Sequence, residues 1–432
     1  MRIIFSYAHG FDLQKYNFIP TFEKIFCIVR VVIIGAGAAG CFCSVALKRR
    51  YPEAQVLVFE AASRPMVKLS LTGGGRCNLT NSFARLKSVD EAYPRGTALM
   101  RRALRSFGPE QALVWFEAEG VRFTLQEDGC YFPVSQDAGQ IVRTLSRAMQ
   151  RSGVELHCRS AVRRLEALPE GGFRIFGDAF SVDADRVVVT TGGSVRRDFL
   201  SFLAPLGLEV VPPVPSLFTF NVADACLRTL PGLVVENARI AIPGTRFSAA
   251  GTLLLTHWGF SGPAALKLSS YAARWLAEAG YRAPLCVNWL GCSQQECRLQ
   301  LEALQRDYPL RSCANARIEA LPHRLWEVLL ERAGIGLQLR WKELSVSALN
   351  RLCLVLTDYS CAMAGKYPHR EEFVTCGGVA LTEVSAQTLE SKRFSGLYFA
   401  GEVLDIDAIT GGFNLQAAWS AAHTVAMSLK ID

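Results

Sequence analysis

Long apolar segments without charge are scarce in this sequence. The longest candidate, residues 31–47, has no charged residue but contains three glycines, whereas a membrane-spanning helix needs about 20 predominantly apolar residues. Residues 1–29 mix charged and aromatic side chains and have no uninterrupted apolar stretch of the signal-peptide type. We therefore expect neither a membrane segment nor a signal peptide, and we treat residues 1–29 as an N-terminal extension.

The cysteine pattern lacks any C-x-x-C pair and any regular spacing. The chain has 14 cysteines, many in apolar contexts, which is typical of a protein from a reducing compartment. Cys292 and Cys297 have a spacing found in some flavin disulfide reductases, but they lie far from the first glycine turn. Ser293 and Glu296 instead predict a capping box at the start of a helix. We predict a cytoplasmic protein without a metal site.

Concentrated positive charge is also missing. The formal net charge is +8, but the arginines are scattered as pairs and form no polybasic tail or stripe. This distribution argues against a nucleic-acid partner and favours a small-molecule substrate. With 432 residues, of which 50% are hydrophobic, the chain can bury a sizeable core and is long enough for two or three domains.

The clearest motif in the sequence is the stretch Val31 to Glu60. An apolar run predicts a buried parallel strand, and Gly35, Gly37 and Gly40 follow it at G-x-G-x-x-G spacing. Such a turn directs the free N–H groups of a helix toward a pyrophosphate. Glu60 ends the second strand about 20 residues later, where a carboxylate can bind a ribose diol. A dinucleotide site is favoured over a purely structural βαβ unit.

Further glycine turns follow this unit. Residues 72–78 read TGGGRCN, a loop that lets backbone lie against a ligand, although an ordinary surface loop is the alternative. A buried strand over 186–190 runs into Thr191, Gly192 and Gly193, at the sheet edge where α/β proteins bind ligands. Cys77 is either a bystander or a thiol near a reactive ring.

The C-terminal part returns to α/β character. A strand ends at Gly401 and Glu402, and residues 409–414 then open a helix that reaches about residue 427. The N-terminus of this helix could stabilise negative charge on a reduced flavin ring. Alternatively, Gly411 and Gly412 form only a turn before a core helix.

His257 lies between two glycine-rich bends in THWGFSGP, residues 256–263. It is a candidate general acid, base or substrate contact. A hydrogen-bonded structural histidine at a strand end is an equally good interpretation.

Taken in order, these segments resemble a family of bacterial FAD-dependent flavoproteins that contains aminoacetone oxidase and a bile-acid 3-dehydro-Δ4,6-reductase. The resemblance covers nearly everything from residue 31 to the C-terminus. The sequence differs from the family after Gly193, where many relatives have a longer polar loop. The segments that carry the resemblance are VVIIGAGAAG (31–40), TGGGRCNLTN (72–81), TTGG (190–193), THWGFSGPA (256–264), TLESK (388–392) and GLYFAGEVLDIDAITGGFNLQAAWS (396–420).

The resemblance implies an α/β fold with a discontinuous FAD-binding domain of the glutathione-reductase type, Rossmann-like, and an inserted β-barrel-like and helical domain. It implies FAD on the first glycine turn, Glu402 at the ribityl or pyrophosphate region, and Gly412 to Asn414 near the flavin ring. The full set of predicted cofactor contacts is Gly35, Gly37, Ala38, Ala39, Gly40, Glu60, Gly74, Gly75, Arg76, Cys77, Asn78, Thr191, Gly192, Gly401, Glu402, Gly412, Phe413 and Asn414.

The expected domain order follows from the same reading. Residues 30–210 and 371–432 would form the two parts of the FAD-binding domain, 211–262 an inserted β subdomain, and 263–370 an inserted helical subdomain. We expect a FAD-dependent oxidoreductase that acts on a small molecule, with NAD(P)H as a candidate transient donor. The alternatives are an amine-type flavin oxidase that uses dioxygen and a flavoprotein that acts on RNA.

Overall fold

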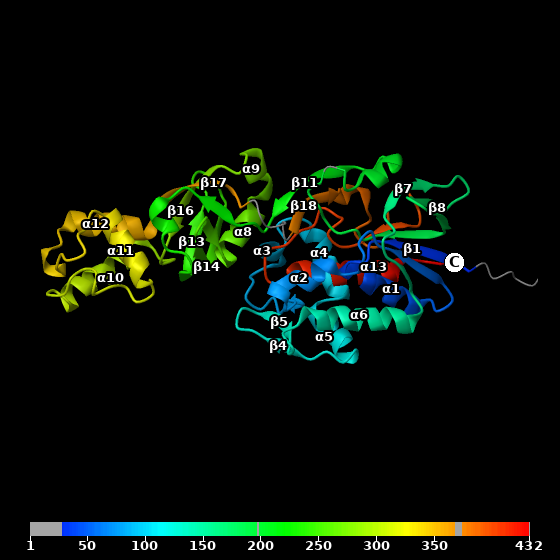
Figure 1. The fold of residues 1–432 in the computed structure, drawn as a ribbon, viewed down its shortest axis with the longest axis horizontal. Helices are drawn as coiled ribbons and strands as arrows, with labels where there is room; N and C mark the ends of the chain where they lie inside the picture. The colour runs from blue at the N-terminus through cyan, green and yellow to red at the C-terminus, as the bar shows by residue number, and fades with distance from the viewer. Residues whose placement is uncertain (1–27, 197, 368–373, 432) are drawn as a thin grey trace, which may run out of the picture.

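The computed structural model describes residues 28–196, 198–367 and 374–431. Almost all of the predicted extension, residues 1–29, lies outside this range. Among the described helices, none combines the length and apolarity that crossing a bilayer requires. Figure 1 shows an elongated molecule, with a Rossmann-like part at one end, a barrel in the middle and helices at the other end.

A five-stranded parallel sheet forms the centre of the Rossmann-like part. In the order β19-β10-β1-β2-β6, the first strand of the chain, β1, lies in the centre between β10 and β2. Strands β1, β2, β10 and β19 are apolar and buried along nearly their whole length, as parallel strands covered on both faces should be, whereas the edge strand β6 is exposed. Their bounds are β1 (Arg30–Ile34), β2 (Gln55–Phe59), β6 (Glu155–His157), β10 (Arg186–Val189) and β19 (Leu397–Phe399).

Helices from both ends of the chain cover this sheet. The first helix and the last helix pack directly against each other, so the C-terminal segment completes the domain begun at β1. Phe42 and Trp419, one from each helix, are fully buried at this contact. The helices of this part are α1 (Ala38–Arg50), α2 (Val67–Gly75), α3 (Val89–Ala92), α4 (Thr97–Ser106), α5 (Pro109–Ala118), α6 (Ala138–Ser152) and α13 (Phe413–Ser428).

Smaller antiparallel sheets flank the main sheet. One has the order β3-β5-β4, one has the order β7-β8-β9, and a third pairs β11 with β18. The β11–β18 pair lies between the Rossmann-like part and the barrel (Figure 1). Their bounds are β3 (Thr80–Asn81), β4 (Phe123–Leu125), β5 (Cys130–Pro133), β7 (Val162–Ala167), β8 (Phe173–Gly177), β9 (Ser181–Ala184), β11 (Val210–Ser216) and β18 (Val374–Val379). Two short 3-10 helices are η1 (Ser201–Leu206) and η3 (Leu381–Glu383).

The insertion contains a closed six-stranded barrel. Two of its strands, β16 and β17, come from residues 263–370, which the sequence had suggested would be helical. Each of these strands follows a helix in the chain, so its apolar residues resemble part of a helical segment until the barrel pairing shows them as strands. In barrel order the strands are β12 (Phe220–Val222), β15 (Gly259–Ser261), β14 (Ser248–Thr256), β13 (Val234–Ala241), β16 (Ala283–Asn288) and β17 (Tyr359–Lys366).

The barrel and the inserted helices share one hydrophobic core, separate from the core of the Rossmann-like part. Trp289 from the barrel and Trp326 and Trp341 from the helical part are all fully buried in it. The insertion therefore packs as one unit rather than as separate β and helical halves. Its helices are α7 (Ala225–Arg228), α8 (Pro263–Tyr271), α9 (Ala273–Glu278), α10 (Gln294–Asp307), α11 (His323–Arg332), η2 (Trp341–Glu343) and α12 (Val346–Thr357).

The predicted capping box at Ser293 is confirmed. The Ser293 hydroxyl accepts a hydrogen bond from the backbone N–H of Glu296 at 3.2 Å, and the Glu296 carboxylate accepts from the Ser293 N–H at 2.7 Å. The cysteines that lie in the described residues are all free, and Cys297 is fully buried. The local sequence is thus explained by the start of α10.

Candidate cofactor site

The first glycine turn is shaped by close backbone contacts. A Cβ on Gly40 would lie 2.0 Å from the carbonyl oxygen of Gly35, so only glycine lets α1 approach the strand so closely. Gly35 has φ +104°, and a Cβ there would lie 2.7 Å from the Thr190 carbonyl. Gly37 differs, because its Cβ would meet nothing nearer than 4.0 Å. The exposed side of this turn is therefore open at Gly37, where the sequence predicts the pyrophosphate.

Glu60 is held against this turn from the end of β2. Its carboxylate accepts hydrogen bonds from the N–H of Ala36 and the N–H of Ala62, both at 2.7 Å. These contacts fix the orientation of the carboxylate while leaving lone pairs on both oxygens. The arrangement suits the predicted acceptor for ribose hydroxyls.

Two helices begin near the sheet edge without a capping side chain. The N-cap residues are Gly37 for α1 and Gly412 for α13, and neither helix has an acidic residue in its first turn. The predicted contacts Ala38 and Ala39 occupy the first turn of α1, and Phe413 and Asn414 occupy that of α13. Uncapped helix N-termini carry partial positive charge and free N–H donors, which an anionic ligand can satisfy.

The predicted loop at residues 72–78 overlaps the end of α2, where a kink interrupts the helix. Thr72, Gly73 and Gly74 depart from helical torsion angles. A Cβ on Gly74 or Gly75 would meet no atom within 4 Å, so this backbone borders open space. The Arg76 guanidinium stacks over the Phe132 ring at 4.4 Å, which turns that side chain toward the protein.

Cys77 lies inside the loop rather than on its surface. Its side chain is fully buried, and its φ of +61° is rare for a residue with a Cβ. Burial raises the pKa of the Cys77 thiol to about 12. The thiol is therefore protonated at neutral pH, and a place for Cys77 beside the cofactor stays a prediction.

Asn78 joins this loop to the start of α13. In the amide orientation that satisfies both partners, its side chain donates to the Thr80 carbonyl at 3.0 Å and accepts from the Gly412 N–H at 3.2 Å. Asn81 adds a second link, because its amide donates to the Gly411 carbonyl at 3.0 Å. The two glycine loops, more than 330 residues apart in the chain, thus form one surface.

The carboxyl end of β10 contributes a third segment. The Thr191 hydroxyl is buried and has no hydrogen-bond partner among the described residues, which is unusual for a buried polar atom. A Cβ on Gly193 would lie 2.8 Å from the Glu402 carboxylate, and Gly192 has φ +74°. At this edge, a hydroxyl without a hydrogen-bond partner therefore lies beside a glycine backbone that is in close contact with Glu402.

Glu402 is anchored beside that edge. Its carboxylate accepts from the Thr375 N–H at 2.8 Å and forms an ion pair with Lys68 of α2 at 3.0 Å. Gly401 precedes it with φ +80°, and a Cβ there would lie 3.1 Å from Ala39 of α1. Lys68 was missed from the sequence, since a single lysine on an amphipathic helix gives no signal of its own.

The side chains of Phe413 and Asn414 face away from the open surface. Phe413 is buried, with its ring 4.9 Å from that of Phe83. The Asn414 amide bridges the N–H and carbonyl of Ala408, both at 2.9 Å. Only their backbone amides are thus placed as the cofactor prediction requires.

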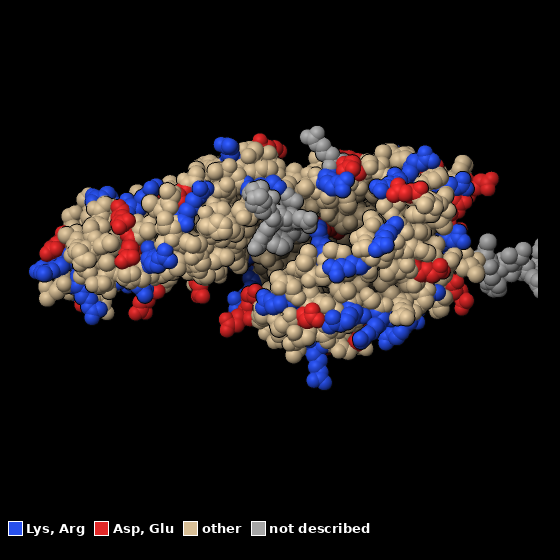
Figure 2. All heavy atoms as spheres, in the orientation of Figure 1, with Lys and Arg blue, Asp and Glu red and all other residues tan. Residues whose placement is uncertain are grey.

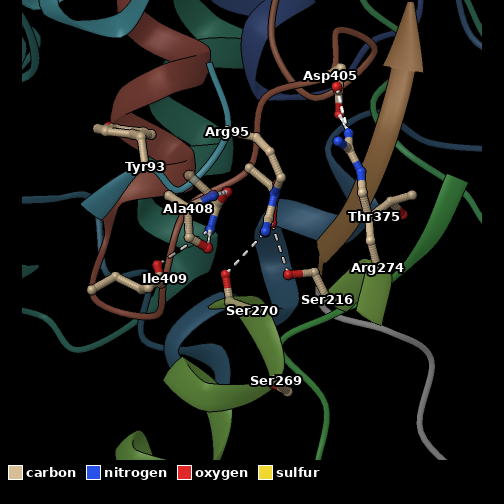
Figure 3. Close-up of polar contacts among 12 residues, drawn as sticks. Tyr93, Arg95, Ser216, Ser269, Ser270, Arg274, Thr375, Asp405, Ala408 and Ile409 are labelled. Atoms are coloured by element: carbon tan, nitrogen blue, oxygen red, sulfur yellow. Dashed lines mark hydrogen bonds and ion pairs between the residues drawn. The ribbon is translucent and has the colours of Figure 1, made fainter. Parts of the chain in front are cut away.

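A buried ion pair that the sequence did not reveal lies beside the loop before α13. Arg95 forms a bidentate pair with Asp407, whose side chain is fully buried, and the Ser216 hydroxyl donates to the same carboxylate at 2.9 Å. Arg95 also donates to the Ser270 hydroxyl of α8 at 3.4 Å. Burial raises the pKa of Asp407, an effect that Arg95 and Ser216 oppose. Figure 3 shows Arg95, Ser216 and Ser270 close together, although they come from three separate parts of the chain.

Further contacts join the insertion to the Rossmann-like part. Arg274 of α9 pairs with Asp405 at 2.6 Å (Figure 3), and the Tyr271 hydroxyl donates to the Glu91 carbonyl at 3.0 Å. Burial raises the pKa of the nearby Cys376 thiol to about 11. The insertion is therefore fixed against the segment that precedes α13.

His257 occupies the turn between β14 and β15 and is exposed. Its ring makes an edge contact with Trp258, which in turn stacks on Tyr367 with 4.1 Å between ring centroids. Its described contacts do not include the glycine turns. A catalytic role for His257 stays a prediction.

The residues present fit a dinucleotide. Two uncapped helix N-termini, an open loop at Gly74 and Gly75 and the unpartnered Thr191 hydroxyl supply donors along one edge of the sheet. Glu60 and Glu402 supply acceptors at separate points on that edge. The described residues hold no group of three or more His, Cys, Asp or Glu suited to a metal ion.

Comparison with known proteins identifies the family. Residues 29–428 match the model of the HI0933-like protein Rossmann domain. The chain belongs to the HI0933-like family. This confirms the family resemblance seen in the sequence and, with it, the nucleotide-binding Rossmann fold and the oxidoreductase class.

Two curated relatives are similar over nearly their whole length. The chain is 32% identical over 407 residues to the ribosomal RNA dihydrouridine synthase of Escherichia coli, covering 92% of this chain and 97% of the relative. It is 28% identical over 403 residues to the 3-dehydro-bile acid delta(4,6)-reductase of Clostridium scindens, covering 91% and 97%.

The solved structures that match this chain have low sequence identity to it and resemble it only in backbone fold. The 3-ketosteroid delta1-dehydrogenase of Sterolibacterium denitrificans is 13% identical with a TM-score of 0.47, covering 92% of this chain and 98% of that chain. A quinol fumarate reductase of E. coli is 14% identical with the same TM-score, covering 92% and 69%. At these values the similarity does not extend to function.

Proposed function

We propose that this protein is a FAD-dependent reductase that saturates a carbon–carbon double bond conjugated to a carbonyl group, and that its substrate is a uridine in ribosomal RNA. The observation that carries the substrate is the match to the E. coli ribosomal RNA dihydrouridine synthase across 97% of that relative. The Haemophilus influenzae protein of the same name is 28% identical over 410 residues. Dihydrouridine is uridine with its ring double bond saturated.

FAD would lie along the edge formed by the glycine turns. Gly37, Ala38 and Ala39 would bind the pyrophosphate, Glu60 the adenosine ribose, and Glu402 the ribityl region. When bound and reduced by NAD(P)H, FAD would supply the hydride for one carbon of the double bond, and a proton from water would complete the addition at the other carbon. The backbone amides at the start of α13 would stabilise negative charge on the ring. The Asn78 link to Gly412 orients those amides, and the Arg95–Asp407 pair fixes the loop before them.

The charge distribution in the sequence favoured a small-molecule substrate, whereas the match to a ribosomal RNA dihydrouridine synthase favours RNA. Scattered arginines argued against a nucleic-acid partner in the linear sequence, and the fold leaves the basic side chains distributed. Figure 2 shows them on the Rossmann-like part and on the insertion, with acidic side chains among them. The net charge of +8 is nevertheless compatible with a nucleic-acid partner.

The experiment is reduction of unmodified ribosomal RNA by the FAD-loaded protein under anaerobic conditions, with NADH or NADPH as the donor. Digestion to nucleosides and mass spectrometry should detect dihydrouridine, two mass units heavier than uridine, only when donor and protein are both present. The matched control is Gly37→Ala, which should fold but bind FAD weakly. Absence of dihydrouridine, with the flavin visibly reduced by the donor, would refute the RNA substrate.

A second candidate is a reductase of small conjugated ketones, favoured by the similarity to the bile-acid reductase. The same double-bond chemistry would apply, so the site does not separate the two substrates. A 3-keto-4,6-diene steroid, offered to the reduced protein in place of RNA, would lose its long-wavelength absorbance if this candidate is correct.

A further inference from the structure

A pocket of about 470 Å³ lies between the segment after α10 and the segment before η2. Figure 1 shows α10, α11 and α12 at the end of the molecule opposite the Rossmann sheet. The position of the pocket separates it from every glycine turn described above. The residues that line it are Leu310, Arg311, Ser312, Asn315, Gln338 and Arg340. All but Leu310 are polar, and no acidic residue is among them.

The pocket is built on a rigid base. The segment after α10 is tied to the segment before η2 by the hydrogen bonds from Cys313 N–H to the Leu339 carbonyl at 2.8 Å and from Trp341 N–H to the Arg311 carbonyl at 3.1 Å. Cys313 and Trp341 are fully buried beneath it. Arg311 and Arg340 therefore start from two joined segments, so their stems are held near each other before any ligand binds.

Within the part of the chain that the structure describes, neither guanidinium forms an ion pair with a carboxylate. Nearby acids are already engaged: Asp307 pairs with Arg306 at 2.8 Å, and Glu343 accepts from the Arg340 backbone N–H at 3.1 Å. The Ser312 hydroxyl is buried and has no partner among the described residues. A pocket with two available cations and an unsatisfied hydroxyl is suited to an anion with several oxygens.

Phosphate has the matching chemistry. Guanidinium groups bind its oxygens in pairs, and the amides of Asn315 and Gln338 add neutral donors. Tyr308, which is 41% exposed, lies beside the pocket with Arg311 over its ring at 4.9 Å. Leu310, which is 68% exposed, extends this apolar edge. Cations beside an exposed aromatic ring are typical of surfaces that bind a nucleic-acid backbone and its bases.

We infer that this pocket binds a backbone phosphate of the RNA substrate and anchors the RNA far from the reacting base. The inference rests on the proposed function. A small substrate at the glycine turns cannot also reach the opposite end of the molecule, whereas a folded RNA can contact both. The pocket would then contribute to affinity for large RNA without taking part in the chemistry.

The test compares the FAD-loaded wild type with the double variant Arg311→Gln/Arg340→Gln in fluorescence anisotropy with a labelled ribosomal RNA fragment across a salt series. We expect about tenfold weaker binding in 0.1 M salt and a log–log salt slope smaller by about 2, one for each lost phosphate contact. NADPH-driven reduction of the flavin should be unchanged. The control is Arg306→Gln/Arg298→Gln, which removes two exposed arginines that already have carboxylate partners.

Each remaining outcome has a separate meaning. Equal RNA binding by the wild type and the double variant would overturn the phosphate anchor and leave the proposed function standing. Isothermal titration calorimetry with inorganic phosphate extends this result. If RNA binding is equal but phosphate binds the wild type and not the double variant, the pocket binds a free anion instead. A wild type that neither binds RNA nor forms dihydrouridine would remove the proposed function and the anchor together.

Discussion

At the scale of single residues, two glycines three positions apart have different tasks. Gly40 is required by packing, because a Cβ there would lie 2.0 Å from the Gly35 carbonyl and 2.5 Å from the Thr190 hydroxyl. Gly37 has φ −79° and free space around it, so packing does not require it. Its side of the turn is open toward the predicted pyrophosphate.

Substitution should separate these tasks. Gly40→Ala should lower the free energy of unfolding by roughly 3 kcal/mol, because backbone atoms must move to admit the methyl group. Gly37→Ala should leave the melting temperature of the FAD-free protein nearly unchanged but weaken FAD binding by about tenfold or more, roughly 1.4 kcal/mol. Thermal denaturation and FAD fluorescence titration measure the two effects. Equal loss of stability in both variants would contradict this division.

Arg95 contributes to stability by neutralising a buried carboxylate. Arg95→Leu leaves Asp407 fully buried without its cation, which should cost about 3 to 5 kcal/mol. Replacing both residues, as Arg95→Leu/Asp407→Leu, should recover most of this loss because no isolated charge remains. Chemical denaturation of the single and double variants gives the comparison. If the double variant is as unstable as the single one, the loss of free energy comes from the missing ion pair and not from the unpaired buried charge.

The same variant has a predictable pH dependence. Burial raises the pKa of Asp407 in the folded protein above its ordinary value of 3.8, and removing Arg95 removes the main opposing influence. The folded state then binds a proton more readily than the unfolded state, so stability increases as pH falls. Arg95→Leu should therefore regain part of its lost melting temperature between pH 8 and pH 5, relative to the wild type measured in the same buffers.

At the scale of elements, α13 connects the cofactor edge to the core. Its start meets Asn78, and its interior packs on α1. In its last two turns, His423 stacks on Phe107 with 4.6 Å between ring centroids. Burial lowers the pKa of His423 below 6.5, so the folded protein favours the neutral ring.

This shift makes α13 sensitive to acid. The stabilising contribution is present above pH 6.5 and is lost as pH falls toward the folded pKa, because the unfolded chain takes up the proton first. His423→Phe keeps the aromatic contact and removes the titration. Its melting temperature should fall less than that of the wild type between pH 7.5 and pH 5.5. An identical decrease in both proteins would assign the acid sensitivity to other groups.

At the scale of the whole molecule, two hydrophobic cores meet through a mainly polar junction. The Arg95–Ser270, Arg274–Asp405 and Tyr271–Glu91 contacts join them. Proteins with separate cores often unfold in more than one step. FAD would bind the Rossmann-like part and should stabilise that part by mass action.

We therefore expect two calorimetric transitions. Added FAD should raise the midpoint of one transition by several degrees and leave the other nearly unchanged. Gly37→Ala, with its weaker FAD binding, serves as the control in which that midpoint should rise less at the same FAD concentration. A single cooperative transition in the wild type would show that the junction couples the two cores fully.

The linear sequence determined the parts whose signals are local. Residues 31–60 alone predict the strands, the glycine turn and the acid, because each depends on neighbours within a few residues, and the structure confirms β1, α1 and β2. The capping box at Ser293 and the course of α13 were predicted for the same reason. The family, too, could be inferred, since its motifs are continuous segments.

Only the tertiary structure decided which distant segments meet. The Arg95–Asp407 pair, the contact of Asn78 with Gly412 and the ion pair of Lys68 with Glu402 each join residues more than 300 positions apart. Barrel strands β16 and β17 likewise acquire their character from partners across the insertion. Such contacts leave no periodicity in the sequence, because a side chain's partner is chosen by the packing of whole elements rather than by its neighbours along the chain.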